Sequence, residues 1–445
     1  NFWPQSQKFL IEKPHSPRSK VFSTSTLTST STSTSTSTFQ KYLLSKEIFY
    51  LCVLSFSLPL KKLFRISTVP MSLNLLLKGQ LRYLNEFYDV TAISGAGKDM
   101  DEVQNREQVK TQVIEMAREI SPFQDLMALY RLYRYFKKEK PDIIHSITPK
   151  AGLLSMLAGK FARVPVRMHT FTGLIFPSKK GIFKTVLIGM DRLLAGCATH
   201  IYPEGEGVKE DLIKYCITQK PLKRIANGNV NGIDTAYFTR NEISTGILEN
   251  LKADLGIEEN CFVFIFVGRL VRDKGINELI AAFSNLNLNL NLNLNLNLKL
   301  LLVGPLEAEL DPLLPQTLQE IATNPNIISG GFQKDVRPYF LLSDALIFPS
   351  YREGFPNVVL QSLALQVPAI VTDINGSNEI ITHGKNGLIV PPKNASELQK
   401  AMERLLTDRA LRESLRAYSQ QSILRFEQKL VWEALLAEYQ MIDGD

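Results

Sequence analysis

The amino-acid sequence predicts an α/β protein with two doubly wound domains that face each other across a cleft. Apolar strand-like segments alternate with amphipathic helical segments twice along the chain, which is typical of right-handed βαβ units and parallel sheets. Residues 227–234, which separate the two series, are rich in Asn and Gly and suit a domain boundary. At 445 residues the chain is also too long for a single hydrophobic core.

The strand candidates are short, nearly continuous apolar runs, as expected for a parallel sheet that is covered on both faces. Those of the first series are 63–69, 90–94, 109–115, 143–147, 166–171 and 199–202. Those of the second series are 261–267, 300–303, 326–329, 345–349, 369–372 and 388–390. The clearest helical patterns are at 122–138, 150–161, 395–406, 409–426 and 431–441.

Two low-complexity segments depart from this plan. Residues 1–62 include a Ser-Thr tract with nothing to bury, so we expect an unstructured extension there. Its apolar stretch at 48–60 is too short to span a bilayer of ~30 Å, and a membrane-touching segment is the alternative. Residues 285–298 are an Asn-Leu repeat, which we interpret as a lengthened loop before the 300–303 strand.

The composition is that of a globular protein, with 44% hydrophobic and 21% charged residues. The four cysteines (Cys52, Cys197, Cys216 and Cys261) lack the spacing of zinc sites or disulfide frameworks. We therefore expect reduced core thiols in a cytosolic protein. The five histidines are scattered and do not indicate a metal cluster.

Positive charge is concentrated in the first half. Residues 61–230 carry 27 Lys and Arg against 16 Asp and Glu, whereas residues 231–445 carry 18 against 26. The basic groups are Lys137, Lys138, Lys140 and Lys150, and Lys179, Lys180 and Lys184 beside Phe176, Ile182 and Phe183. An anionic membrane surface would attract such groups, and a solvated helix face is the alternative. We do not expect nucleic acid as a partner, because no binding motif accompanies the charge.

The first block with clear chemical potential follows the 261–267 strand. Gly268 and Arg269 end this strand, and Lys274 follows in the next loop. Ligands of parallel sheets bind at the carboxyl ends of strands, where loops meet helix N-termini. Arginine can bond phosphate oxygens bidentately and lysine adds a point charge, so the two side chains could hold a diphosphate.

A second polar block follows the 345–349 strand. Glu353 lies in the loop after this strand, where a carboxylate can accept hydrogen bonds from sugar hydroxyls. Gly354 next to it allows a ligand to approach the backbone closely. Gln361 follows about two helical turns after Glu353, so we expect both side chains on the same face. Together the two blocks indicate a nucleotide-sugar enzyme.

These blocks resemble the C-terminal half of the family 4 glycosyltransferases, retaining enzymes of the GT-B fold with two Rossmann-like domains. The matching segments there are Gly268-Arg269-Leu270, Lys274-Gly275, Glu353-Gly354-Phe355-Pro356-Asn357 and residues 387–392. Residues 146–150 and 169–173 are similar to segments that line the family's cleft. The resemblance covers Leu63 to the C-terminus and is greatest to the bacterial capsule, O-antigen and glycan-assembly branch.

The resemblance implies roles for individual residues. The implied catalytic residues are His169, Arg269, Lys274 and Glu353. The implied donor-binding residues are Gly268, Arg269, Lys274, Glu353, Gly354, Phe355, Asn357 and Gln361. The two cations would hold the donor diphosphate, Glu353 would contact the transferred sugar, and His169 would lie beside the reaction centre.

The family organisation also implies domain bounds. Residues 63–228 would form an acceptor-binding domain and residues 229–429 a nucleotide-sugar-binding domain, with a final helix at 430–445 packed back on the first. Two positions depart from the family pattern. Gln361 replaces the second of two glutamates, which keeps hydrogen bonding but loses the charge. Residues 69–74 lack the glycine pair common in the first strand–helix loop, which leaves the acceptor contacts open.

The function expected from these features is retaining transfer of a hexose or N-acetylhexosamine from a UDP-sugar to a polyprenyl-diphosphate-linked saccharide. The enzyme would work at the cytoplasmic face of the plasma membrane, without a cofactor or metal. Asp99-Met100-Asp101 matches the pattern of metal-dependent transferases, but such tripeptides are common and this one is expected in a polar loop. The alternatives are a catalytically impaired sugar-nucleotide-binding homologue, supported by Gln361 and the repeats, and a GT-B-fold UDP-sugar epimerase.

Overall fold

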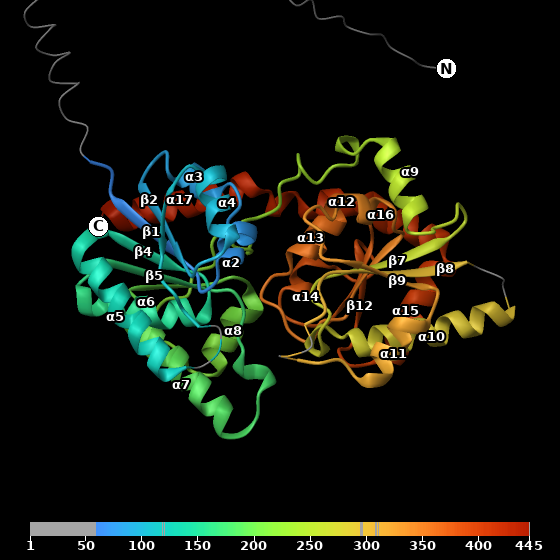
Figure 1. Cartoon of the computed structure of the whole chain (residues 1–445), viewed down its shortest axis with the longest axis horizontal. Helices are drawn as coiled ribbons and strands as arrows, with labels where there is room; N and C mark the ends of the chain where they lie inside the picture. Colours follow the sequence, from blue (N-terminus) through green and yellow to red (C-terminus); the bar gives the residue numbers. More distant parts are fainter. Residues whose placement is uncertain are drawn as a thin grey trace, which may run out of the picture. The chain divides into compact units, whose positions relative to one another are not determined.

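The computed structural model describes residues 59–444 apart from 118, 120, 294–296, 308 and 310. The expected extension at 1–62 therefore lies almost wholly outside the described residues. In the described part, the strands form two six-stranded parallel sheets with the orders β3-β2-β1-β4-β5-β6 and β12-β11-β10-β7-β8-β9. In each, the strand order reverses beside the first strand of the series, which is the doubly wound arrangement. The predicted α/β class is confirmed (Figure 1).

All twelve strands overlap the predicted segments. The first sheet contains β1 (Lys62–Ile66), β2 (Asp89–Ser94), β3 (Lys110–Val113), β4 (Ile143–Ser146), β5 (Val166–Phe171) and β6 (His200–Pro203). The second contains β7 (Phe262–Val267), β8 (Leu298–Val303), β9 (Ile327–Gly331), β10 (Ala345–Phe348), β11 (Ala369–Thr372) and β12 (Gly387–Val390).

Helices connect the strands in both halves. Those of the first half are α2 (Pro70–Leu76), α3 (Gln80–Leu84), α4 (Lys98–Glu107), α5 (Pro122–Glu139), α6 (Pro149–Ala162), α7 (Gly181–Cys197) and α8 (Glu206–Lys214). Those of the second half are α9 (Thr245–Asp254), α10 (Ile276–Asn293), α11 (Pro315–Thr323), α12 (Arg337–Leu341), α13 (Asn357–Ala364), α14 (Ser377–Ile380), α15 (Ala395–Thr407) and α16 (Arg409–Ile423). The last helix is α17 (Gln428–Gly444).

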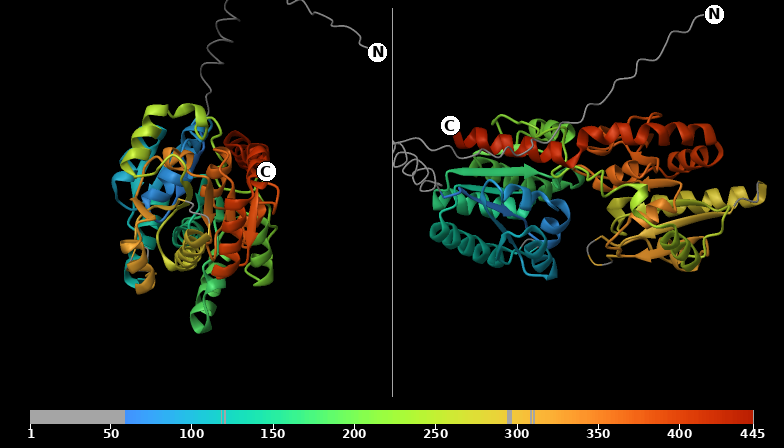
Figure 2. Two further views of the ribbon diagram at one scale, coloured as in Figure 1. Left: turned by 90° about the vertical axis from the view of Figure 1, so that its right-hand side faces the viewer. Right: turned by 90° about the horizontal axis from the view of Figure 1, so that it is seen from above.

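Two hydrophobic cores flank the first sheet. One contains residues of α5, α6 and α7, such as Leu132 and Leu194. The other contains residues of α2 and α4 together with Leu435 and Tyr439 of α17. The last helix therefore packs on the first sheet, and it can be followed there in Figures 1 and 2.

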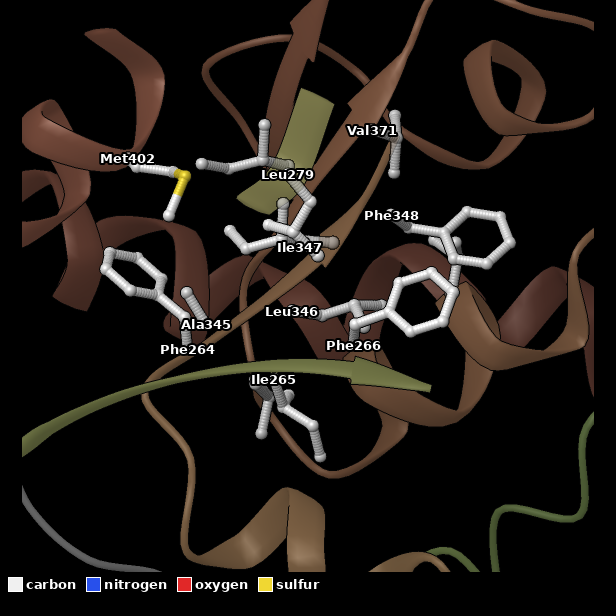
Figure 3. Packing of buried hydrophobic residues seen from close by; sticks show 14 of the residues in the cluster. Phe264, Ile265, Phe266, Leu279, Ala345, Leu346, Ile347, Phe348, Val371 and Met402 are labelled. Atoms are coloured by element: carbon white, nitrogen blue, oxygen red, sulfur yellow. The ribbon is translucent and has the colours of Figure 1, made fainter. Parts of the chain in front are cut away.

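A third core surrounds the second sheet and fixes the strands that precede the candidate site. Phe266 of β7 and Phe348 of β10 stack with ring centroids 6.1 Å apart. Figure 3 shows the two rings side by side. Both side chains are almost fully buried. Because these residues lie next to the strand ends, their packing determines where the following loops begin.

Three expectations about local structure were wrong. The Asn-Leu repeat is helical up to Asn293, because α10 starts at Ile276 and continues into it. Leucine is a good helix former, and a helix that has already nucleated gains one hydrogen bond with each added residue. Asp99 and Asp101 lie in the first turn of α4 rather than in a loop, as acidic residues near a helix N-terminus often do. Cys216 is exposed, so it is not a core thiol.

Candidate functional site

The strand ends of the second sheet bring the predicted cationic and acidic blocks together. A 3₁₀ turn at Arg272–Lys274 follows β7, and the loop that carries Glu353 follows the neighbouring strand β10. The Nζ atom of Lys274 contacts the carboxylate of Glu353. The backbone holds the two segments together as well, because the N–H of Tyr351 donates to the carbonyl of Asp273 at 2.8 Å.

Arg269 lies beside this pair in sequence but has a different partner. Its guanidinium donates to Glu307 at 2.7 Å, and its side chain is 40% exposed. Gly268 packs against the end of β8, where a Cβ atom on Gly304 would come within 1.9 Å of the Gly268 carbonyl oxygen. Glu307 follows β8 and was not identified from the sequence, although it obeys the same strand-end rule.

The residues after Glu353 contact the first half of the chain at Thr172 and other segments at Asn229 and Phe426. A Cβ atom on Gly354 would lie 2.3 Å from the carbonyl oxygen of Thr172, so only glycine fits there. Phe355 is buried against Phe426, with ring centroids 5.2 Å apart. The amide oxygen of Asn357 accepts a hydrogen bond from Asn229 at 2.5 Å.

The expectation that Glu353 and Gln361 share a helix face was wrong. Helix α13 begins at Asn357, so Glu353 belongs to the preceding loop and helical periodicity does not relate the two positions. The Gln361 side chain is half-buried in the helix.

His169 lies in the core of the first sheet. Its side chain is 1% exposed, and Nδ1 forms a hydrogen bond of 2.8 Å with the Ser146 hydroxyl. Its Nε2 is buried without a hydrogen-bond partner among the described residues. Burial lowers the pKa of His169 to about 3, so the ring is neutral near pH 7. From the same segment, Thr172 and Gly173 contact Gly354, while His169 packs beside Gly152 of α6.

A second buried histidine supports the last helix rather than the site. His145 forms hydrogen bonds with the Tyr439 hydroxyl of α17 at 2.6 Å and with Thr170 at 2.8 Å. Burial lowers its pKa, and the neighbouring Arg65 guanidinium lowers it further. His145 is therefore a buried histidine whose two ring nitrogens both have hydrogen-bond partners.

Glu204 is the most perturbed acid near these residues and was not identified from the sequence. It lies between β6 and α8 and is 8% exposed. Burial raises the pKa of Glu204 to about 8; the Val230 backbone N–H opposes this rise, and the Glu353 and Glu379 carboxylates add to it. Glu379 itself accepts hydrogen bonds from the backbone N–H groups of Glu206 and Gly207 at 2.7 and 3.1 Å.

The arrangement has the groups needed to bind a diphosphate at one end and a polyhydroxyl ligand at the other. Among the described residues, no group of three or more His, Cys, Asp or Glu side chains is placed to hold a metal ion. Arg269 and Lys274, as cations at the strand ends, are the candidates for binding a phosphate group.

Two family models match the chain. Residues 79–228 match the model described as a glycosyl transferase 4-like domain, and residues 248–422 match that of glycosyl transferases group 1. The chain is 31% identical to the capsular polysaccharide biosynthesis glycosyltransferase CapM of Staphylococcus aureus over 382 residues, which cover 85% of this chain and 97% of CapM. It is 29% identical to the UDP-Gal:alpha-D-GlcNAc-diphosphoundecaprenol alpha-1,3-galactosyltransferase of Escherichia coli, covering 66% of this chain and 74% of that enzyme.

Solved structures show the same fold. The crystal structure of Anabaena HepE in complex with UDP and glucose superposes with a TM-score of 0.72 at 17% identity and covers 86% of this chain and 100% of HepE. Together with the two doubly wound sheets, this similarity confirms the GT-B fold class.

Proposed function

The chain belongs to the group 1 glycosyltransferases, and on that premise we propose that it moves a hexose or N-acetylhexosamine from a UDP-sugar, with retention, to a polyprenyl-diphosphate-linked saccharide during surface polysaccharide assembly. The observation that carries this proposal is the placement of Lys274, Glu353 and Arg269 at the strand ends of the second sheet. The Escherichia coli relative is named for a UDP-sugar donor and a diphosphoundecaprenol-linked acceptor, which supports both assignments.

The proposed reaction needs no side-chain base. The bond between C1 of the sugar and the diphosphate oxygen breaks as C1 bonds to the acceptor oxygen on the same face. The acceptor's hydroxyl proton passes to an oxygen of the leaving phosphate. Arg269 and Lys274 would stabilise the charge that develops on the diphosphate, and Glu353 would orient the sugar hydroxyls. Fixed cations would thus serve where other transferases use a metal, so we propose no cofactor.

The assay offers UDP-sugars to the protein with a lipid-linked saccharide and detects the extended lipid by mass spectrometry. Arg269→Ala should lose most of its turnover, about a hundredfold or more. The matched control is Arg272→Ala, a 62% exposed arginine of the adjacent turn, which should stay active. Normal UDP release by Arg269→Ala would contradict the proposal. UDP binding without turnover by the native chain would favour the impaired homologue, and Gln361→Glu would then test that position.

We also propose that the first domain docks on the cytoplasmic face of an anionic membrane. No helix of the described residues is long and apolar enough to cross a bilayer. Helices α5 and α7 both pack against α6, and both expose large apolar side chains. These are Phe123, Leu126, Met127 and Tyr130 on α5, and Ile182, Phe183 and Val186 on α7. Exposed lysines and arginines accompany them, and such surfaces bind anionic lipid.

Lys150 of the expected basic groups and Phe176 beside them do not belong to this surface. Lys150 is 11% exposed and pairs with Asp125 at 2.7 Å, and Phe176 is buried against Tyr215. We expect the double change Ile182→Ser with Phe183→Ser to weaken sedimentation with phosphatidylglycerol vesicles. Ile247→Ser on α9 is the control, because this side chain is 51% exposed in the other half. Equal sedimentation of all three proteins would contradict docking through α7.

A further inference from the structure

Glu204 of the first domain lies directly against the loop that carries Glu353. A Cβ atom on Gly354 would come within 2.5 Å of the Glu204 Oε2 atom. Gly173 lies against the same loop, since its Cβ atom would meet the Gly354 nitrogen at 3.2 Å. The carboxyl of Glu204 is therefore packed against the residue that follows Glu353, on the side of the first domain.

The backbone of Glu204 is fixed from two directions. Its N–H donates to the carbonyl of Phe171 at 3.1 Å, and its carbonyl accepts from the N–H of Asn229 at 3.1 Å. The Asn229 side chain in turn bonds Asn357 at the start of α13. The Glu204 backbone is thus linked through Asn229 to the start of α13, at the end of the loop.

The charged groups on the side of the second domain are mainly acidic. Glu353 and Glu379 both act on the Glu204 carboxyl as like charges. Each is partly neutralised, because Glu353 contacts Lys274 and Glu379 lies 3.4 Å from Arg224. A charge on Glu204 would add a third carboxylate to a closely packed interface.

The groups of the first domain near Glu204 would only partly compensate a negative charge on its carboxyl. Arg65, His145 and Tyr202 line a cavity of about 20 Å³ together with Glu204. The Arg65 guanidinium donates to Gln80 at 3.0 Å and to the Tyr439 hydroxyl at 2.8 Å. The lowered pKa of His145 keeps that ring neutral near pH 7, so it adds no positive charge.

We propose that Glu204 is a positioning residue that, as a neutral carboxylic acid, holds the 350–357 loop in place and, on ionising, loosens it. This inference rests on the proposed function only for its consequence, which is that loosening the loop displaces Glu353 and weakens binding of the UDP-sugar. The contact between Glu204 and Gly354 exists whatever the donor is.

The direction of the pH effect follows from the buried state of the carboxyl. The pKa of Glu204 is raised to about 8 from its ordinary value of 4.5, so the group is mostly neutral in the folded protein at pH 7. The stability that the neutral form provides is complete below about 4.5 and is lost as the pH rises through about 8. The loop should therefore be held less firmly at pH 9 than at pH 7.

The test compares the native chain with Glu204→Gln, a neutral residue of the same shape. Hydrogen exchange of the 350–357 peptide is measured for both proteins at pH 7 and pH 9, without any ligand. We expect the native chain to lose protection relative to Glu204→Gln between pH 7 and pH 9, while the protection of Glu204→Gln stays the same. In the assay, the donor KM of the native chain should rise at least about fivefold between these pH values, with a smaller change in Glu204→Gln.

Glu210→Gln, an exposed position on α8, is the matched control and should behave like the native chain. If Glu204→Gln does not fold, the native chain alone still tests the proposal. Its 350–357 peptide must then lose protection from hydrogen exchange between pH 7 and pH 9, compared with the peptides of β5 in the same protein. Equal exchange of native chain and Glu204→Gln at pH 9 would overturn the proposal. A failure of UDP-sugar turnover with the expected exchange would instead contradict the proposed function and leave the positioning role standing.

Discussion

The ammonium group of Lys274 contacts the carboxylate of Glu353, although the two residues are 79 positions apart in the sequence. Their side chains are 16% and 15% exposed, so the pair is better shielded than a surface ion pair. One residue is proposed to bind the diphosphate and the other the sugar. When the donor binds, contacts with the ligand would therefore replace part of the interaction between Lys274 and Glu353. Before the donor binds, the ion pair holds both side chains in place.

Lys274→Met should reveal this coupling, because it removes the charge and keeps most of the volume. We expect UDP affinity to fall about tenfold or more, since a charged hydrogen bond to phosphate is lost. We also expect the free energy of unfolding to fall by about 1–3 kcal/mol, because Glu353 is left unpaired. The measurements are calorimetric titration with UDP and urea unfolding.

The control for stability is Lys400→Met, which breaks an exposed pair with Glu397 and should cost at most about 1 kcal/mol. The double variant Lys274→Met with Glu353→Gln should recover part of the lost stability, because no unpaired charge remains. If the effects of the two changes on the unfolding free energy simply add, Lys274 and Glu353 are not coupled, and the pair does not stabilise the fold as we infer.

Glu307→Gln tests whether Glu307 competes with the ligand for Arg269. The pair is 40% exposed on the arginine side, so breaking it should change the unfolding free energy by less than about 1 kcal/mol. Releasing the guanidinium should strengthen UDP binding by about two- to fivefold, because Arg269 no longer has to give up its ion pair with Glu307 when it binds UDP. Weaker UDP binding would mean that Glu307 orients Arg269 for the ligand instead.

Gly354→Ala should damage the contact between the halves of the chain. The added methyl group would lie 2.3 Å from the Thr172 carbonyl oxygen, so either the loop or the 172–173 segment must move. We expect loss of most activity with a smaller loss of thermal stability. Gly189→Ala on α7 is the control, because a Cβ atom there meets nothing within 4 Å and alanine favours a helix by roughly 1 kcal/mol. Full activity of Gly354→Ala would show that the tight contact is not needed.

Most of the fold could be predicted because its signals are local. Buried parallel strands are continuous apolar runs, and β5 spans Val166–Phe171 as expected. The Asn-Leu repeat was misjudged for a reason that is also physical. Its period of two favours a strand, but the preceding helix from Ile276 provides a nucleus that the repeat extends up to Asn293. The domain bounds at 228 and 229 stay a prediction.

The candidate site could be predicted only in part. The strand-end rule located Lys274 and Glu353, because each follows an apolar strand directly. It did not single out Glu204 or Glu307, since nothing local distinguishes a glutamate that will be buried or paired from one that faces water. The depth of His169 could not be predicted either, because it depends on the packing of α6 and α7 above the sheet.

Asp191 on α7 provides a pH-dependent test of stability away from the proposed site. It lies one helical turn before Leu194, which is fully buried, and burial raises the pKa of Asp191 to about 7. Because the pKa in the folded protein is above the ordinary value of 3.8, its neutral form stabilises the fold at low pH, and this contribution is lost as the pH rises through about 7. Asp191→Asn should therefore raise the Tm at pH 8 by about 2–4 °C and raise it by less at pH 5.

Differential scanning calorimetry at the two pH values checks this result. Asp125→Asn is a control of opposite sign, because Asp125 is paired with Lys150 at 2.7 Å and its loss should lower the Tm. A Tm of Asp191→Asn that equals that of the native chain at pH 8 would mean that the carboxylate is solvated. In that case α7 would open to water near Asp191.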